Sequence, residues 1–152
     1  MNDIDIHDAA PSNEAERGLI EAECSRLIAS FAFLVDHRRY AELVALFTED
    51  GSFQRPGGRA TGTAALRDLM NARPTTIVTR HVCAIPFFET VSAEQVTAVT
   101  YVTVYHVEGA DGRVSEISSP AAIAEFHDVF RRTQQGWRIH QRVAAPVLIF
   151  KH

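Results

Sequence analysis

Two polar side chains interrupt apolar stretches where core residues would be expected. His81 lies within VTRHVCAIPFFE at 78–89, a stretch typical of a strand. Asp36 lies within FLVDHRRYAELVALF at 33–47, where it interrupts an apolar stripe at the predicted end of a helix. A neutral imidazole takes up a proton readily near pH 7, because its ordinary pKa is about 6.5. A neighbouring carboxylate fixes the tautomer of the ring and stabilises the imidazolium. Our hypothesis is that Asp36 and His81 belong to one site for proton abstraction.

Each of these residues also has a structural alternative. Asp36 precedes a second helical segment and could be its N-cap. A histidine on an apolar strand face is more often a hydrogen-bonded core residue than a base. A third alternative is a metal site in which Asp36, His81 and His106 supply two imidazoles and one carboxylate. We disfavour the metal site, because no pair of histidines shows the short spacing typical of such ligands.

Size and composition limit the classes of protein to consider. With 152 residues, 46% of them hydrophobic, the chain is predicted to form one globular domain. A net charge of -4 gives no basic footprint for nucleic acid or for an anionic membrane surface. The first residues are acidic and polar and resemble no targeting segment, so we expect a cytoplasmic protein. Residues 1–12 are predicted to be a flexible arm and 13–152 the single domain.

Hydrophobic periodicity predicts helices in the first half of the chain and strands in the second. Apolar residues recur at helical spacing in three segments, and the later segments alternate as strands do. The predicted helices span 13–35, 40–47 and 63–73, with a short strand near Phe53 and a loop at 55–62. The later strands are predicted at 77–90, 95–107, 117–133 and 137–147. This order favours an α+β fold with three helices packed on one face of a strongly curved sheet.

Several segments resemble the SnoaL-like branch of the nuclear transport factor 2-like superfamily. They are LVDHRRYAELVALFTEDGSF, GTAALRDL, TRHV and the closing QGWRIHQRV, and the resemblance covers about residues 14–147. The fold that it implies is a cone-shaped α+β barrel, in which a bent mixed sheet encloses a pocket and the helices cover the open side. Fold similarity alone does not fix the function, because one scaffold hosts many chemistries.

Within that superfamily the chain is most similar to scytalone dehydratase, hexachlorocyclohexane dehydrochlorinase and the bile-acid dehydratases. Asp36 and His81 match their catalytic Asp and His, and His106 matches a second His of scytalone dehydratase. Phe53 stands at the position of an aromatic pocket wall in the dehydrochlorinase. Gln54 and Phe126 stand near positions where scytalone dehydratase has a substrate-holding Tyr and a pocket Asn. The resemblance therefore does not carry that enzyme's substrate over to this chain.

Strand alternation adds further residues to the predicted pocket. Ile77, Thr79, Cys83 and Ile85 should share the face of His81, and Thr100, Val102 and Val104 should share that of His106. Tyr101 and Tyr105 should point away. The side chains predicted to contact a substrate are His106, Phe53, Cys83, Val102, Val104 and Phe126.

The function implied is that of a cofactor-independent lyase. A dehydratase or dehydrohalogenase of this kind would act on a small, largely apolar cyclic molecule and would need neither a metal nor an organic cofactor. One alternative is an isomerase like ketosteroid isomerase, in which the proton returns elsewhere on the substrate. The other is a non-catalytic ligand-binding or assembly subunit, like the small subunits of ring-hydroxylating dioxygenases. Relatives associate through the exposed sheet face, so we expect a homodimer or homotrimer.

Overall fold

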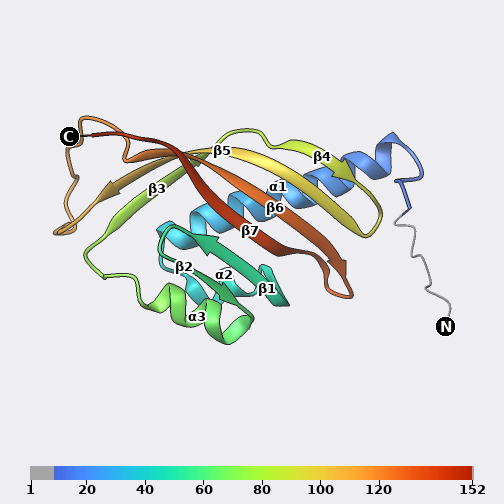
Figure 1. Ribbon diagram of the computed structural model, residues 1–152, viewed down its shortest axis with the longest axis horizontal. Helices are drawn as coiled ribbons and strands as arrows, with labels where there is room; N and C mark the ends of the chain where they lie inside the picture. Colours follow the sequence, from blue (N-terminus) through green and yellow to red (C-terminus); the bar gives the residue numbers. More distant parts are fainter. Residues whose placement is uncertain (1–8, 152) are drawn as a thin grey trace.

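The computed structural model describes residues 9–151 and consists of three helices and a seven-stranded sheet (Figure 1). The helices are α1 (Glu14–Asp36), α2 (Tyr40–Val44) and α3 (Thr63–Asn71). The strands are β1 (Phe47–Arg55), β2 (Gly58–Thr61), β3 (Val78–Cys83), β4 (Phe87–Val91), β5 (Gln95–Val107), β6 (Ala122–Thr133) and β7 (Gly136–Ile149). Most of the predicted arm at 1–12 lies outside the described residues; within it, the carbonyl of Ala9 accepts a hydrogen bond from the Ala93 N–H at 2.8 Å.

The strands form one mixed sheet in the order β2-β1-β7-β6-β5-β3, and β4 pairs with β5. Strands β1 and β7 are parallel, whereas the other neighbours are antiparallel. Helix α1 runs across one face of the sheet, and α3 lies beside β1 and β2 (Figure 1). The predicted α+β class and curved mixed sheet are confirmed. The sheet is not closed into a barrel, because β2 and β3 end the path without pairing with each other.

Helix α1 begins and faces the sheet as its sequence predicts. The Asn13 side chain caps it, accepting a hydrogen bond from the Glu16 N–H at 2.8 Å. Its buried side chains recur at helical spacing, so that one stripe of the helix packs against the sheet. They are Ile20, Cys24, Ile28, Phe31, Ala32, Leu34 and Val35. Among residues 9–151, no helix combines the length and the apolar character that crossing a membrane requires.

The end of α1 turns sharply into α2 through a residue in the left-handed region. Arg38 has φ of 57°, the Arg39 N–H donates to Leu34 O at 2.9 Å and the Arg38 N–H donates to Val35 O at 3.3 Å. This pairing is a Schellman motif, which usually has glycine at the position of Arg38. The Arg38 guanidinium group donates to the carbonyl oxygens of Pro74, at 2.7 Å, and of Ile77. It therefore ties the start of β3 to the end of α1.

The predicted loop at 55–62 and the predicted strand at 77–90 both differ in the structure. Residues within that loop form β2, which pairs with β1 through a turn at Gly57 (φ 90°). The strand is interrupted at 84–86, where the five residues from Cys83 to Phe87 face only the four residues from Val99 to Val102 on β5. The extra residue shifts the alternation of side chains between the two faces. Ile85 is 93% exposed as a result, so its prediction as a neighbour of His81 is wrong.

Candidate active site

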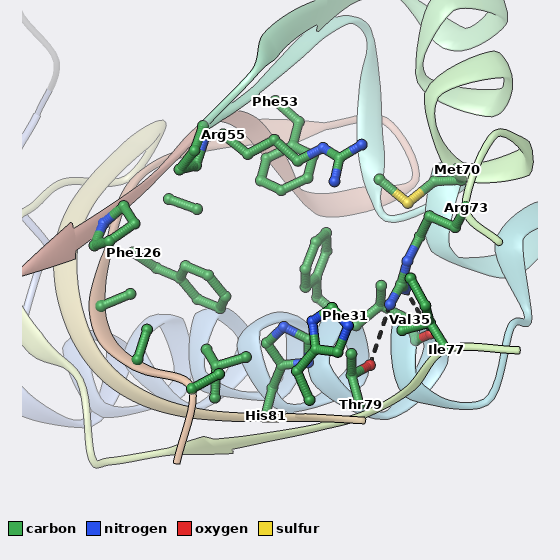
Figure 2. A pocket seen from close by; sticks show the side chains of 18 of the residues that line it. Phe31, Val35, Phe53, Arg55, Met70, Arg73, Ile77, Thr79, His81 and Phe126 are labelled. Carbon is green, nitrogen blue, oxygen red and sulfur yellow. Dashed lines mark hydrogen bonds between the residues drawn. The ribbon is translucent and has the colours of Figure 1, made fainter. Parts of the chain in front are cut away.

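A cavity of about 660 Å³ lies between the C-terminal half of α1 and the concave face of the sheet (Figure 2). Most of its wall is apolar, and five strands contribute to it. The lining residues are Phe31, Val35, Phe53, Arg55, Pro56, Met70, Ala72, Arg73, Pro74, Ile77, Thr79, His81, Val104, His106, Ala121, Ala122, Ala124, Phe126, Ala144, Pro146 and Ile149. A concave, largely apolar cavity with a few polar groups is the usual form of a small-molecule site.

Asp36 and His81 meet at the wall of this cavity. Asp36 is the last residue of α1 and His81 lies in the middle of β3, and the Asp36 Oδ1 atom is 2.6 Å from the Nδ1 atom of His81. Their side chains are 5% and 15% exposed, respectively. The second carboxylate oxygen, Oδ2, accepts the backbone N–H of His81 at 2.8 Å. Two contacts to the same residue fix the carboxylate relative to both the ring and the strand.

The carboxyl group of Asp36 is held in its ionised form. Burial acts to raise its pKa, but the hydrogen bonds from the His81 side chain and backbone and from Thr79 outweigh burial, so that the pKa is lowered. An ionised carboxylate can only accept hydrogen bonds. When the His81 ring is neutral, it must therefore carry its proton on Nδ1. Its Nε2 atom then has a free lone pair, and this atom has no hydrogen-bond partner among residues 9–151.

Figure 2 shows the His81 ring pointing from β3 into the cavity. The unprotonated nitrogen is thus available to a molecule bound there, while the opposite nitrogen is held by Asp36. This is the arrangement of a general base, because an imidazole that accepts a proton becomes a cation stabilised by the carboxylate behind it.

A second layer of contacts positions the carboxylate. The Thr79 hydroxyl donates to Asp36 Oδ1 at 2.8 Å and accepts from the Arg73 guanidinium group at 3.1 Å. Arg73 also donates to the carbonyl oxygen of Val35 at 3.0 Å, next to Asp36 in α1. Sequence reasoning placed Thr79 on the correct face but missed Arg73. No sequence signal marks Arg73, since its partners lie 6 and 38 residues away along the chain.

Aromatic rings form the floor of the cavity. The Phe31 ring makes edge-to-face contacts with Phe53 and Phe126, with centroids 5.4 Å and 5.8 Å apart. Beneath them the fully buried Arg142 pairs with Asp128 through two hydrogen bonds of 2.7 Å. The Arg142 guanidinium carbon also lies 4.3 Å and 4.2 Å from the Phe31 and Phe126 ring centroids. The floor is thus stiffened by cation–π contacts as well as by packing.

The structure places the predicted substrate-contacting residues in two groups. Phe53, Val104, His106 and Phe126 line the cavity together with His81. Cys83 and Val102 are paired across β3 and β5; Val102 is fully buried in the core, and neither belongs to the cavity lining. The prediction that these two contact a substrate is not supported by their placement. His106 is at the cavity edge, with Nε2 3.5 Å from Glu108 Oε1.

Asp36 is not the N-cap of α2, and it does not form a metal site with the histidines among the described residues. The residue at the N-cap of α2 is Arg39, and Asp36 makes its contacts to β3 instead of capping a helix. Within the described part of the chain, no three His, Cys, Asp or Glu side chains converge as metal ligands. Tyr101 is 61% exposed on the opposite face of the sheet, as its alternation predicts.

Comparisons with known proteins agree with this architecture. A candidate scytalone dehydratase from Novosphingobium aromaticivorans superposes with a TM-score of 0.75, at 19% identity over 91% of both chains. A cystatin-like-fold protein of unknown function from Nostoc punctiforme gives a TM-score of 0.72, at 24% identity over 85% of this chain and 92% of that one. The β subunit of a candidate aromatic-ring-hydroxylating dioxygenase from N. aromaticivorans gives 0.73, at 16% identity over 89% and 94%.

These similarities show a shared fold. Among curated protein sequences there is no significant match. The family model of the SnoaL-like domain matches residues 16–143, which is most of the chain and includes Asp36, His81 and most of the residues that line the cavity. The chain therefore belongs to the SnoaL-like domain family, as its sequence resemblance predicted.

Proposed function

We propose that the protein is a cofactor-independent lyase in which His81, held by Asp36, removes a proton from a small cyclic substrate. The observation that carries this proposal is the 2.6 Å contact between Asp36 and His81 beside an unpartnered Nε2 atom at the wall of an apolar cavity. The fold similarity to a candidate scytalone dehydratase is consistent with a dehydration. The aromatic floor suits a flat, unsaturated ring system.

The reaction is an elimination next to a carbonyl group. The Nε2 atom of His81 takes a proton from the carbon beside the carbonyl, and the electron pair of the C–H bond forms the new C=C bond. The leaving hydroxyl group departs from the neighbouring carbon with its bonding electrons. Return of the proton from the imidazolium to that hydroxyl releases water and restores neutral His81. If the leaving group is a halide, it departs as the anion and the proton passes to solvent.

Asp36 contributes by stabilising the imidazolium that forms midway. Its carboxylate keeps the proton on Nδ1 throughout and offers a negative charge at 2.6 Å when the ring becomes positive. Thr79 and Arg73 act as positioning residues for this carboxylate. His106, at the edge of the cavity, is the second group able to protonate the leaving oxygen or to polarise the carbonyl.

The first test replaces the base and keeps the cavity. We expect His81→Gln to lower kcat for elimination from bicyclic β-hydroxyketones by about 10²–10⁴-fold, because general-base assistance is lost. Elimination is followed by the ultraviolet absorbance of the enone product. Exchange of the α-protons of 1-tetralone for deuterium, followed by NMR, reports proton removal without a leaving group. Binding of 1-tetralone should be nearly unchanged by the substitution.

His127→Gln is the matched control. His127 also contacts a carboxylate, with Nε2 2.8 Å from Glu125 Oε2, but it is exposed on the opposite face of the sheet. This variant should retain wild-type turnover. Equal turnover in wild type and His81→Gln would contradict the proposal. Formation of a rearranged ketone without loss of water would favour the isomerase. A wild type without turnover, together with a His81→Gln variant that fails to fold or to assemble, would favour a structural subunit.

A further inference from the structure

The ionisable groups that line the cavity are all basic. Arg55 and Arg73 contribute guanidinium groups, and His81 and His106 contribute imidazoles. Among residues 9–151, no Asp or Glu lines the cavity; the Asp36 carboxylate lies behind His81 and accepts its hydrogen bonds from Thr79 and His81. Charges inside apolar walls act more strongly than they do in water, because the local dielectric constant is low. Arg55 and Arg73 therefore give the cavity a positive potential, which the single Asp36 carboxylate behind His81 only partly offsets.

The two arginines differ in how their hydrogen bonds are used. Arg73 donates to Val35 O and to the Thr79 hydroxyl, so it is part of the scaffold around Asp36. Burial lowers the pKa of Arg73, and the positive charges of Arg38 and Arg55 act in the same direction, while Tyr40 and Asp36 oppose them. The half-buried Arg55 has no hydrogen-bond or ion-pair partner among residues 9–151.

Arg55 lies across the cavity from His81. It is the last residue of β1, whereas His81 is on β3, the far end of the sheet, and the curvature of the sheet brings both to the same cavity. Figure 2 shows the Arg55 side chain on the wall opposite His81, with its guanidinium group directed over the opening toward Met70. A ligand whose reacting carbon is at His81 can therefore present its far end to Arg55.

We propose that the substrate is a cyclic carboxylic acid whose carboxylate binds Arg55 while its reacting carbon lies at Nε2 of His81. The fork of a guanidinium group matches the two oxygens of a carboxylate, and the pair is bidentate in its usual form. A half-buried arginine without a counter-ion gains this partner on binding, and Arg73 adds to the positive potential. The position of the reacting carbon at His81 rests on the proposed function, whereas the binding of a carboxylate by Arg55 does not.

The test measures recognition of the acid by binding alone. Isothermal titration calorimetry with 2-naphthoate and with the uncharged 2-naphthamide compares two probes of nearly equal shape. We expect the wild type to bind the acid at least about tenfold more tightly than the amide, which corresponds to one charge-assisted contact. Arg55→Met should abolish this preference and leave the affinity for the amide unchanged. Because the Arg55 side chain makes no hydrogen bond or ion pair among the described residues and Met keeps its unbranched apolar stem, this variant should fold normally.

Arg67→Met is the matched control for net charge, since Arg67 is exposed on α3 and does not line the cavity. It should keep the preference for the acid. Equal affinities for the two probes in the wild type, no binding of 2-naphthoate, or a preference that survives Arg55→Met would each overturn the inference.

The same titrations in His81→Gln separate this inference from the proposed lyase activity. If the acid preference persists in that variant while elimination is absent from the wild type, recognition of a carboxylate stands and the proposed reaction fails. If elimination depends on His81 but the acid and the amide bind equally, the reaction stands and the assignment of the substrate class fails.

Discussion

At the scale of single residues, Asp36 is the group on which the site depends. Its two oxygens accept three hydrogen bonds, from the Thr79 hydroxyl and from the side chain and backbone of His81. All three favour the ionised carboxylate over the neutral acid. The same contacts that prepare His81 as a base also bind α1 to β3. The chemistry of the site and the stability of the fold are therefore linked through one carboxyl group.

This linkage predicts a pH dependence of stability. The pKa of Asp36 in the folded chain lies below its ordinary value of 3.8, so the folded state binds fewer protons than the unfolded state in acid. The contribution of ionised Asp36 to the free energy of unfolding is complete at pH values above the ordinary pKa of this group. It is lost as the pH falls through the lower pKa that Asp36 has in the folded chain. We expect the free energy of unfolding, measured with urea at a series of pH values from about 7 down to about 3, to fall more steeply for the wild type than for Asp36→Asn.

The control for this measurement is Asp68→Asn, because Asp68 is exposed on α3 and its side chain has no hydrogen bond or ion pair among the described residues. Its unfolding free energy should follow the wild-type profile. Parallel profiles for wild type and Asp36→Asn would contradict the assignment of an ionised, hydrogen-bonded carboxylate to Asp36.

At the scale of elements, the turn between α1 and α2 sets where Asp36 lies. Arg38 occupies the left-handed region and is held there by bonds from its guanidinium group to the carbonyls of Pro74 and Ile77. A non-glycine residue with this backbone is strained by about 1 kcal/mol. The bonds to the segment before β3 offset the strain and, in doing so, bring His81 within reach of Asp36.

A comparison of two substitutions isolates the backbone contribution. Arg38→Ala and Arg38→Gly both remove the guanidinium contacts, but only glycine adopts the left-handed conformation without strain. We expect Arg38→Gly to be more stable than Arg38→Ala by about 1 kcal/mol in urea unfolding. A reversed order would mean that the turn is not left-handed at this residue in solution.

The elements that sequence reasoning located well are those with long, regular patterns. The stripe of α1 and the alternation of β5 span many residues, so local pattern and tertiary burial agree. The interruption at 84–86 was missed because it is fixed by pairing with β5, which lies further along the chain. Strand β2 could not be predicted because it is only four residues long and follows a Pro-Gly turn signal, and only pairing with the neighbouring β1 makes it a strand.

Residue type and family resemblance predict Asp36 and His81 but not the two arginines of the cavity. Asp36 and His81 stand out because each is a polar residue within an apolar pattern. Arg55 and Arg73 do not stand out, because arginine is common on surfaces and their importance arises from where the chain folds. Val102 shows the limit of alternation: it shares a face with Val104, but α1 covers that part of the sheet and buries it in the core.

At the scale of the whole molecule, the face of the sheet opposite α1 carries exposed apolar side chains. Ile85, Phe87 and Tyr101 are 93%, 71% and 61% exposed, and they border a hollow of about 600 Å³ that also includes Glu125 and His127. Apolar residues clustered on a sheet face are typical of an interface between proteins. The predicted homo-oligomer, dimer or trimer, would use this face.

Sedimentation at increasing protein concentration tests this prediction. We expect the wild type to associate, and Phe87→Lys to shift the distribution toward the monomer because a charge in the middle of an apolar interface is costly. Val114→Lys is the control, since Val114 is 97% exposed in the segment between β5 and β6, outside this face. A monomeric wild type at all concentrations would argue against an interface here.

The parallel pairing of β1 with β7 has a consequence for how the protein is made. These strands are separated along the chain by five other strands and a helix, yet both supply walls of the cavity, through Phe53 on one and Ala144 on the other. While the polypeptide is emerging from the ribosome, the acid and the imidazole can meet long before the far wall exists. Until the last strand is synthesised, the aromatic floor is uncovered and prone to aggregate. We therefore expect the incomplete chain to bind chaperones that recognise exposed apolar surface.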